Sequence, residues 1–359
     1  KYGDEAKVSR MSIVENNKVK MATLCVHACH HVNGVAKIHS EIIKRETFKD
    51  EYEYTPEKFT NVTNGIAYRR WLYQSNEGLT ELLREKIGSG FLKDASGLAK
   101  LNSFKDDKEV LERLAKIKLD NKNRFAKYVK NEYGVALNTA SIFDVQVKRL
   151  HEYKRQQLNA LNIIAEYNYL KENPDADFTP KTYIFAAKAA PGYYMAKQII
   201  KLIWNISQEL RKNMKLMING AVTLGTMDGA NVEIHEQVGD ENIIIFGMNV
   251  DEVNARKSNY KPIDIYNSNG VVKSAVDRLQ SGINGEQFGE IAGSLKNADT
   301  YMALADFDSY QKAQKYASEC YNDKMKWQRM SLANIANAGI FSADRSVEDY
   351  ARDIWGLKK

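Results

Sequence analysis

The middle of this chain repeats one pattern, a short apolar run followed by apolar positions at helical spacing. The first run contains the β-branched residues Ile142, Val145 and Val147. After this run, apolar residues spaced by three or four positions predict one buried face of a helix. These residues are Leu158, Leu161, Ala165 and Tyr169.

The pattern returns in the stretch KTYIFAAKAAPGYYMAKQIIKLIWNI, where a Pro-Gly break separates an apolar run from a second helical face. This face consists of Met195, Ile199, Leu202 and Ile206. Two further apolar runs lie in AVTLGTMDGAN and ENIIIFGMN. Short apolar strands separated by amphipathic helices are typical of βα units, so the pattern predicts an α/β fold with a buried parallel sheet.

Both ends of the chain have a helical pattern. It is clearest in GLTELLREKIG and in DKEVLERLAKIKLDNKNRFAKYVKNEYG, and it returns in the tail from Tyr316 onward. We expect the last helix to start at Ser346, with Asp349 as its capping pair, and to stop at Gly356. A parallel sheet needs helices on both faces, and these segments supply some of them.

Composition narrows the class of protein. With 43% hydrophobic and 27% charged residues among 359, the chain resembles an ordinary globular protein. Its 3 cysteines are too few for a disulfide framework, which indicates a reducing cytoplasm. No apolar run approaches the roughly 20 residues of a membrane span, and no signal peptide is recognisable. The net charge of +6 is spread over 52 basic and 46 acidic residues, which argues against nucleic-acid binding.

Five basic residues follow the first apolar run: Lys148, Arg149, His151, Lys154 and Arg155. Parallel sheets bind ligands outside the carboxyl ends of their strands, where we expect the first two residues to lie. We expect the other three in the first turns of the next helix, where each positive charge opposes the helix dipole at a cost of about 0.3–1 kcal/mol. A bound phosphate would compensate this cost, but an exposed basic helix face explains the spacing equally well.

The stretch FDVQVKRLHEYKRQQLN closely resembles a signature of the α-glucan phosphorylases. This family depends on pyridoxal phosphate and acts on glycogen, starch and maltodextrin. Other stretches resemble the same family in the same order. They are HHVNGVAKIHSEI, FTNVTNGIAYRRWL, KAAPGYYMAKQIIKLI, NMKLMINGAVTLGTMDGANVEI, IIIFGM and GIFSADRSVEDYARDIWG. The resemblance covers nearly the whole chain, but only the C-terminal part of a full-length phosphorylase.

The resemblance implies a fold and a domain division. The fold would be a Rossmann-like parallel sheet with helices on both faces, the C-terminal domain of a two-domain GT-B glycosyltransferase whose N-terminal half is absent. Residues 1–60 would be a helical remnant of the N-terminal domain, residues 61–330 the Rossmann-like domain that binds pyridoxal phosphate and phosphate, and residues 331–359 a helical tail.

The resemblance also implies roles for four basic residues. Lys215 would form the Schiff base with pyridoxal 5′-phosphate, and burial among its apolar neighbours would lower the pKa of its amine. Lys148 would contact the cofactor phosphate, while Arg149 and Lys154 would hold the substrate phosphate, so these three are the catalytic candidates. His151 and Arg155 would be supporting residues.

Two residues are implied to bind the sugar. The main-chain carbonyl of His30 would contact the transferred glucose, and Asn64 would bind a sugar hydroxyl, although a turn before Gly65 explains Asn64 equally well. The stretch CVHACHHV around His30 is rich in potential zinc ligands, but a zinc site normally needs a second ligand cluster, and none is evident. We therefore expect no metal. The turn at Asp228 and Gly229 would lie near the cofactor pocket without a catalytic role.

The implied activity is that of a glycosyltransferase, the reversible phosphorolysis of a terminal α-1,4-linked glucose by inorganic phosphate to give α-glucose-1-phosphate. The phosphate of the cofactor would act in acid and base catalysis. The partners would be an α-1,4-glucan and phosphate, with no nucleic acid and no membrane, and the parent enzyme would be a cytoplasmic homodimer. The alternatives are an inactive cofactor-binding or structural fragment, and a nucleotide-sugar glycosyltransferase without the cofactor.

The sequence departs from the family immediately before Asn213. Family members carry several dozen further residues there, including a strand and a loop that supplies amides to the cofactor phosphate. Either a mobile segment is omitted or the protein lacks it. Deleting a strand from a sheet would expose apolar surface and leave main-chain groups unpaired, which favours omission.

Overall fold

The computed structural model describes residues 3–210 and 220–357. Contacts within the described chain divide it into two compact units. The first unit contains the chain up to Asn102, Asp228–Asp240 and the part from Ile335 onward, and the second unit contains the remaining described residues. The domain boundaries implied by the resemblance stay a prediction. Within the described ranges, none of the helices has the length and apolar character needed to cross a membrane.

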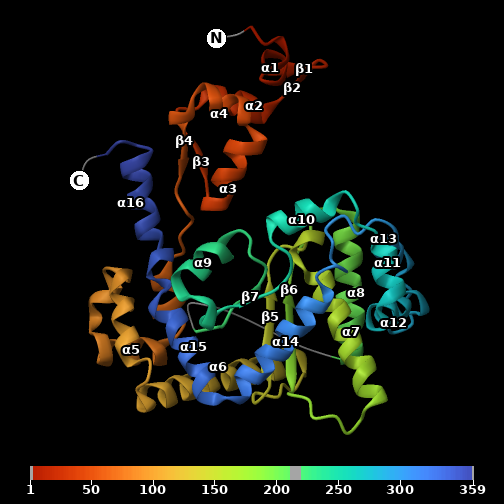
Figure 1. Ribbon diagram of the computed structural model, residues 1–359. Coiled ribbons are helices and arrows are strands. Elements are labelled where there is room, and N and C mark those ends of the chain that lie inside the picture. Colours follow the sequence, from red (N-terminus) through yellow and green to blue (C-terminus); the bar gives the residue numbers. More distant parts are fainter. Residues whose placement is uncertain (1–2, 211–219, 358–359) are drawn as a thin grey trace. The chain divides into compact units, whose positions relative to one another are not determined.

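The first unit contains two small sheets and several helices (Figure 1). The strands are β1 (Val14–Glu15), β2 (Lys18–Val19), β3 (Val32–Gly34) and β4 (Phe59–Asn61). The helices are α1 (Glu5–Arg10), α2 (Met21–Ala28), α3 (Lys37–Ile42), α4 (Lys49–Tyr54), α5 (Glu77–Ile87), α9 (Ala230–Val238) and α16 (Ala343–Asp353). β1 pairs with β2 antiparallel, whereas β3 pairs with β4 parallel and α3 packs against both of these strands.

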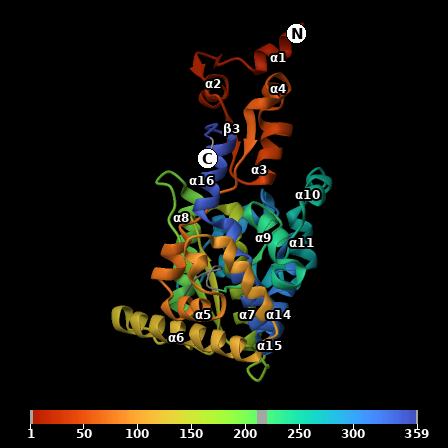
Figure 2. The ribbon, with the colours of Figure 1, turned by 90° about the vertical axis from the view of Figure 1, so that its left-hand side faces the viewer.

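The second unit is larger and richer in helices. Its strands are β5 (Ile142–Val147), β6 (Lys181–Ala186), β7 (Leu224–Gly225) and β8 (Ile244–Ile245). Its helices are α6 (Lys108–Tyr133), α7 (Gln156–Glu172), α8 (Tyr194–Leu210), α10 (Val250–Lys257), α11 (Pro262–Ser268), α12 (Gly270–Ser281), α13 (Gly289–Asn297) and α14 (Phe307–Asn322). α15 (Lys324–Ala336) begins in this unit, and α6 is a single helix of 26 residues (Figure 2).

The strands of the second unit form two parallel pairs. β5 lies beside β6 over six residues, from Ile142 opposite Lys181 to Val147 opposite Ala186 (Figure 1). β7 pairs with β8 over two residues. Parallel strands joined through helices confirm the predicted α/β class, in a helix-rich form with small sheets. In the part of the chain that the structure describes, every named sheet has two strands, so a single extended sheet is not present there.

α7 enters the core of the second unit with its first ten residues, all of which are buried. The predicted face is confirmed at Leu158, Leu161 and Ala165, but the prediction is wrong at Tyr169, which is 52% exposed. A single apolar face describes the end of this helix poorly, because Tyr169 lies beyond the part that the core surrounds. α7 packs against α8 and α12.

α8 keeps the pattern predicted for it. Three of the four predicted residues, Ile199, Leu202 and Ile206, are buried, and Met195 is partly buried against the same core. These side chains join those of α7 in the main hydrophobic cluster of the second unit. This core holds α7, the helix that follows the basic residues found in the sequence.

Candidate functional site

The basic loop, residues 148–155, connects β5 to α7. Lys148 directly follows the last residue of β5, so the predicted position at the carboxyl end of a strand is confirmed. The helix begins later than predicted, because Glu152–Lys154 form a separate 3₁₀ turn and α7 starts at Gln156. Arg155 separates them with a φ of 63°, a left-handed conformation that interrupts the helical path. The prediction that His151, Lys154 and Arg155 occupy the first turns of the helix is therefore wrong.

Two glutamine side chains hold the main chain of the basic loop. Nε2 of Gln156 donates to the carbonyl oxygens of Lys148 (3.5 Å) and Arg149 (3.2 Å). Nε2 of Gln146 donates to the carbonyl oxygen of Lys154 (3.3 Å). Gln156 is fully buried, so its amide is fixed by the core of the second unit. These bonds set the path of the loop without using its charged side chains.

The charges of the basic loop fall into two groups. Arg155 forms an ion pair with Asp306, with Nη2 and Oδ2 2.5 Å apart. In contrast, no acidic side chain of the described ranges pairs with Arg149 or Lys154, and Arg149 is exposed. Lys148 is exposed as well. In the described part of the chain, the two cations without an acidic partner, Arg149 and Lys154, follow the carboxyl end of a strand, which suits an anionic ligand.

His151 belongs to an aromatic cluster beside the loop. Its ring centroid lies 4.2 Å from that of Tyr153 and 4.9 Å from that of Tyr193. The Tyr193 hydroxyl donates to Oε2 of Glu152 at 2.6 Å. Burial and this hydrogen bond raise the pKa of Tyr193 to about 12. The supporting role of His151 stays a prediction.

Lys215 lies outside the described residues. The chain is described again from Gly220, whose carbonyl oxygen accepts hydrogen bonds from Nζ of Lys118 and from Oγ of Ser331, the latter at 2.8 Å. Burial, with a smaller effect of the Lys122 charge, lowers the pKa of Lys118 to about 7. Donors from α6 and α15 thus fix the chain at Gly220.

The two predicted sugar residues belong to the first unit, and both are exposed. His30 lies just before β3, whereas Asn64 lies beyond the end of β4, where its N–H donates to the carbonyl oxygen of Val35 (3.0 Å). Because β3 and β4 are parallel, these positions are at opposite ends of the strand pair. The structure does not bring His30 and Asn64 together.

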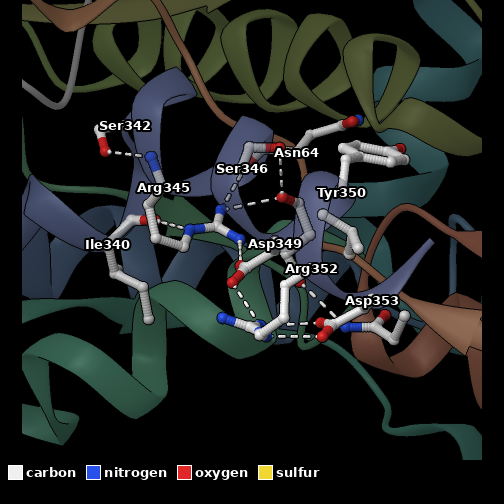
Figure 3. Close-up of polar contacts among 12 residues, drawn as sticks. Asn64, Ile340, Ser342, Arg345, Ser346, Asp349, Tyr350, Arg352 and Asp353 are labelled. Carbon is white, nitrogen blue, oxygen red and sulfur yellow. Dashed lines mark hydrogen bonds and ion pairs between the residues drawn. The ribbon is translucent and has the colours of Figure 1, made fainter. Parts of the chain in front are cut away.

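The Asn64 loop, residues 62–66, is held by the helix at the C-terminal end of the chain (Figure 3). Nη2 of Arg345 donates to the carbonyl oxygens of Thr63 (2.8 Å) and Asn64 (3.5 Å). The hydroxyl of Ser346 donates to the carbonyl oxygen of Thr63 at 3.1 Å. Asp349 fixes the Arg345 guanidinium through an ion pair of 2.8 Å. Main-chain carbonyls are again the anchoring points.

α16 also approaches the loop through its own main chain. It begins at Ala343 with Ser342 as its N-cap, whose side chain accepts a bond from the N–H of Arg345, so the predicted start at Ser346 is wrong. Ser342 forms a parallel bridge with Ile66. A Cβ atom on Gly65 would lie 2.3 Å from the carbonyl oxygen of Ser342, which explains why glycine follows Asn64.

Sequence reasoning missed three charged residues around these loops: Glu233, Asp306 and Arg345. Oε1 of Glu233 accepts bonds from the N–H of Lys37 and the hydroxyl of Thr63, both at 2.9 Å. Glu233 is 7% exposed. Glutamate is rarely buried without a partner, but the sequence does not show that this glutamate is buried. Glu233 lies in the first turn of α9, which follows the turn at Asp228 and Gly229. Gly229 has a φ of 49°.

The stretch around His30 carries exposed, unpaired thiols at Cys25 and Cys29. Across residues 3–210 and 220–357, no group of three or more histidine, cysteine, aspartate or glutamate side chains is arranged to hold a metal ion.

Comparison with known proteins identifies related chains. A family model described as carbohydrate phosphorylase matches residues 1–213 and 211–357. The two matches meet at the position where the sequence departs from the phosphorylase pattern. This junction supports an internal segment that relatives have and this chain does not.

The chain is 41% identical over 408 aligned positions to the liver form of glycogen phosphorylase from Bos taurus and to that from Homo sapiens. It is 41% identical over 409 positions to the muscle form from Homo sapiens. Each alignment covers 99% of this chain but 48% or 49% of the relative, so the chain spans about half the length of the curated relatives it matches. The alignments are longer than the 359 residues of the chain, so they contain gaps on its side.

Proposed function

This chain belongs to the carbohydrate phosphorylase family, and on this premise we propose that it is part of an α-glucan phosphorylase. The reaction is the reversible phosphorolysis of a terminal α-1,4-linked glucose, which gives α-glucose-1-phosphate. One observation carries the proposal. The basic loop presents Arg149 and Lys154 without acidic partners in the described structure, at the carboxyl end of β5.

The residues of the basic loop fit the phosphate part of pyridoxal 5′-phosphate. Lys148 is exposed beside Arg149, and the carbonyl oxygens of both residues accept hydrogen bonds from Gln156, which supports a fixed main-chain path for the loop. Lys148 would hold the cofactor phosphate, and Lys215, which lies outside the described residues, would hold the cofactor covalently through its amine. When bound, the cofactor supplies a second phosphate that exchanges a proton with the substrate phosphate.

Arg149 and Lys154 bind the inorganic phosphate. The guanidinium group of Arg149 provides two parallel N–H donors, and the ammonium group of Lys154 adds a point charge. The bound phosphate donates a proton to the glycosidic oxygen while the bond from this oxygen to C1 breaks, and a phosphate oxygen bonds to C1. The cations reduce the repulsion between two neighbouring phosphates and keep their pKa values near neutral.

Asn64 and the main-chain carbonyl of His30 bind the sugar in this proposal. Two residues of α16 support the role of Asn64. Arg345 donates to the carbonyl oxygens of Thr63 and Asn64, and Ser346 donates to that of Thr63, so the main chain around Asn64 is held. The α-1,4-glucan is the partner of the whole protein, which we propose to be a cytoplasmic homodimer. The parallel pairs β5–β6 and β7–β8 support a Rossmann-like sheet of the GT-B type as the finer fold.

The competing function is that of an inactive cofactor-binding or structural fragment. It is favoured by the gaps on the side of this chain in its 408-position alignment to the relatives. An assay with pyridoxal phosphate, maltoheptaose and inorganic phosphate separates the two. Release of α-glucose-1-phosphate that Arg149→Met abolishes supports the phosphorylase.

Absorbance resolves a negative result of this assay. A Schiff-base band without sugar phosphate release supports the inactive cofactor-binding fragment. If neither appears after reconstitution, both proposals fail, and a nucleotide-sugar glycosyltransferase without the cofactor is favoured.

A further inference from the structure

Asp306 is a buried carboxylate that the proposed chemistry does not use. It is 1% exposed and occupies the N-cap position of α14, yet its side chain accepts no bond from the first turn of that helix. Aspartate at an N-cap usually accepts such a bond, which contributes about 1 kcal/mol. The carboxylate of Asp306 is committed to other partners.

These partners come from two separate turns. Oδ2 of Asp306 accepts a bond of 2.5 Å from Nη2 of Arg155, and Oδ1 accepts a bond of 3.1 Å from the N–H of Met248. Met248 follows Gly247 in the turn after β8, and a Cβ on Gly247 would lie 2.9 Å from Oδ2 of Asp306. Asp306 therefore joins the turn after β8 to the basic loop after β5.

Arg155 is shaped for this connection. Its left-handed backbone places it between the 3₁₀ turn and α7, and its side chain is only 16% exposed. Its Nη1 donates to the carbonyl oxygen of Tyr301 at 2.9 Å. Arg155 follows Lys154 directly, so tethering its side chain fixes the end of the loop from which Lys154 projects.

We propose that Asp306, acting through Arg155, is a positioning residue for phosphate binding by the basic loop. The inference rests on the proposed function of Arg149 and Lys154. Asp306 touches neither phosphate nor sugar. Gln156 holds the start of the basic loop, and Asp306 holds its end through Arg155. Arg149 and Lys154 can bind one phosphate together only if both ends of the loop are fixed.

Two variants separate positioning from simple electrostatics. Asp306→Asn removes a negative charge, so an electrostatic effect alone would strengthen the binding of inorganic phosphate. Arg155→Met removes a positive charge, so the same effect would weaken it. If the tether matters, both variants weaken phosphate binding, by about fivefold to tenfold.

The measurement is calorimetric titration of the chain with inorganic phosphate at a temperature where circular dichroism shows each variant folded. Glu286→Gln is the matched control, because its ion pair with Lys201 in the same unit has side chains about half exposed, and it leaves binding unchanged. Unchanged or tighter binding by Asp306→Asn, with wild-type binding intact, overturns the inference alone. A wild-type chain that binds no phosphate overturns the proposed phosphate site as well.

Discussion

Two loops of this protein, the basic loop of the second unit and the Asn64 loop of the first unit, are held by the same kind of contact. They differ in how far along the chain the supporting residues lie from the loop. In both loops, side-chain donors hold main-chain carbonyls. Gln146 and Gln156, which hold the basic loop, lie within eight residues of the carbonyls they bind. Arg345, which holds the Asn64 loop, is 282 residues from Thr63.

The difference also concerns charge. An arginine holds the Asn64 loop, and its charge is balanced by Asp349. Neutral amides hold much of the main chain of the basic loop, and an ion pair with Asp306 neutralises Arg155. A loop that binds anions keeps its own cations available when its supports are uncharged or internally balanced. The loop that we propose to bind a neutral sugar can use a charged support.

The largest effect is expected where the Asn64 loop touches α16. Gly65→Ala places a Cβ against the carbonyl oxygen of Ser342, and main-chain atoms must shift to relieve the contact. We expect a loss of about 3 kcal/mol in the free energy of unfolding, measured with urea. Gly90→Ala is the control, since a Cβ there meets nothing within 4 Å. Equal effects of the two variants would contradict the close contact.

The next effect tests the charged support itself. Arg345→Met removes donors to the carbonyls of Thr63 and Ile340 and leaves Asp349 with one arginine partner fewer. Charge-assisted bonds of this kind predict a loss of about 2 kcal/mol. Arg352→Met, on the same helix with a side chain 65% exposed, should cost under about 0.5 kcal/mol. An equally large loss of stability in Arg352→Met would show that α16 in general, rather than the hydrogen bonds of Arg345, is responsible.

A buried cation without a carboxylate partner should behave differently from Arg345. The amine of Lys118 has a pKa of about 7 when folded and its ordinary value of 10.5 when unfolded, so between these values the unfolded chain holds more protons. Stability therefore rises with pH above about 7 and is insensitive to this group below it. Relative to Lys118→Met, the wild type should gain about 1–2 kcal/mol between pH 7 and pH 9 in urea unfolding. Parallel pH profiles of the two proteins would contradict the burial of this amine.

The smallest effect on stability is expected at the local support of the basic loop. Gln156→Met keeps the volume of the buried side chain but removes its bonds to the carbonyls of Lys148 and Arg149. We expect a loss of about 1 kcal/mol in urea unfolding, together with weaker binding of inorganic phosphate. A lower free energy of unfolding with unchanged phosphate binding would show that Gln156 stabilises the fold but does not position the phosphate site.

The sequence was sufficient for features that depend on neighbouring residues. Short apolar runs and helical spacing predicted β5, α7 and α8, and the position of Lys148 at the end of a strand followed from them. It was insufficient where one residue leaves the regular pattern. The left-handed conformation of Arg155 delays the start of α7, and no periodicity signals it.

Contacts between distant segments were the second limit. Ser342 and Ser346 are equally plausible caps by residue type, and the structure selects Ser342 because the chain there also pairs with Ile66. Asp306 occupies the N-cap position of α14, but its carboxylate pairs with Arg155, 151 residues away. Residue type alone does not reveal such partners.

The central claim is that Arg149 and Lys154, which have no acidic partner within residues 3–210 and 220–357, bind phosphate together. Calorimetric titration with inorganic phosphate, comparing the wild type with the double variant Arg149→Met/Lys154→Met, tests this claim most directly. Lys171→Met is the control, because Lys171 is an exposed lysine at the far end of α7. We expect about 100-fold weaker binding by the double variant, since each charge-assisted contact contributes about 1.5 kcal/mol, and no change in the control. Equal affinities of the wild type and the double variant would contradict the account.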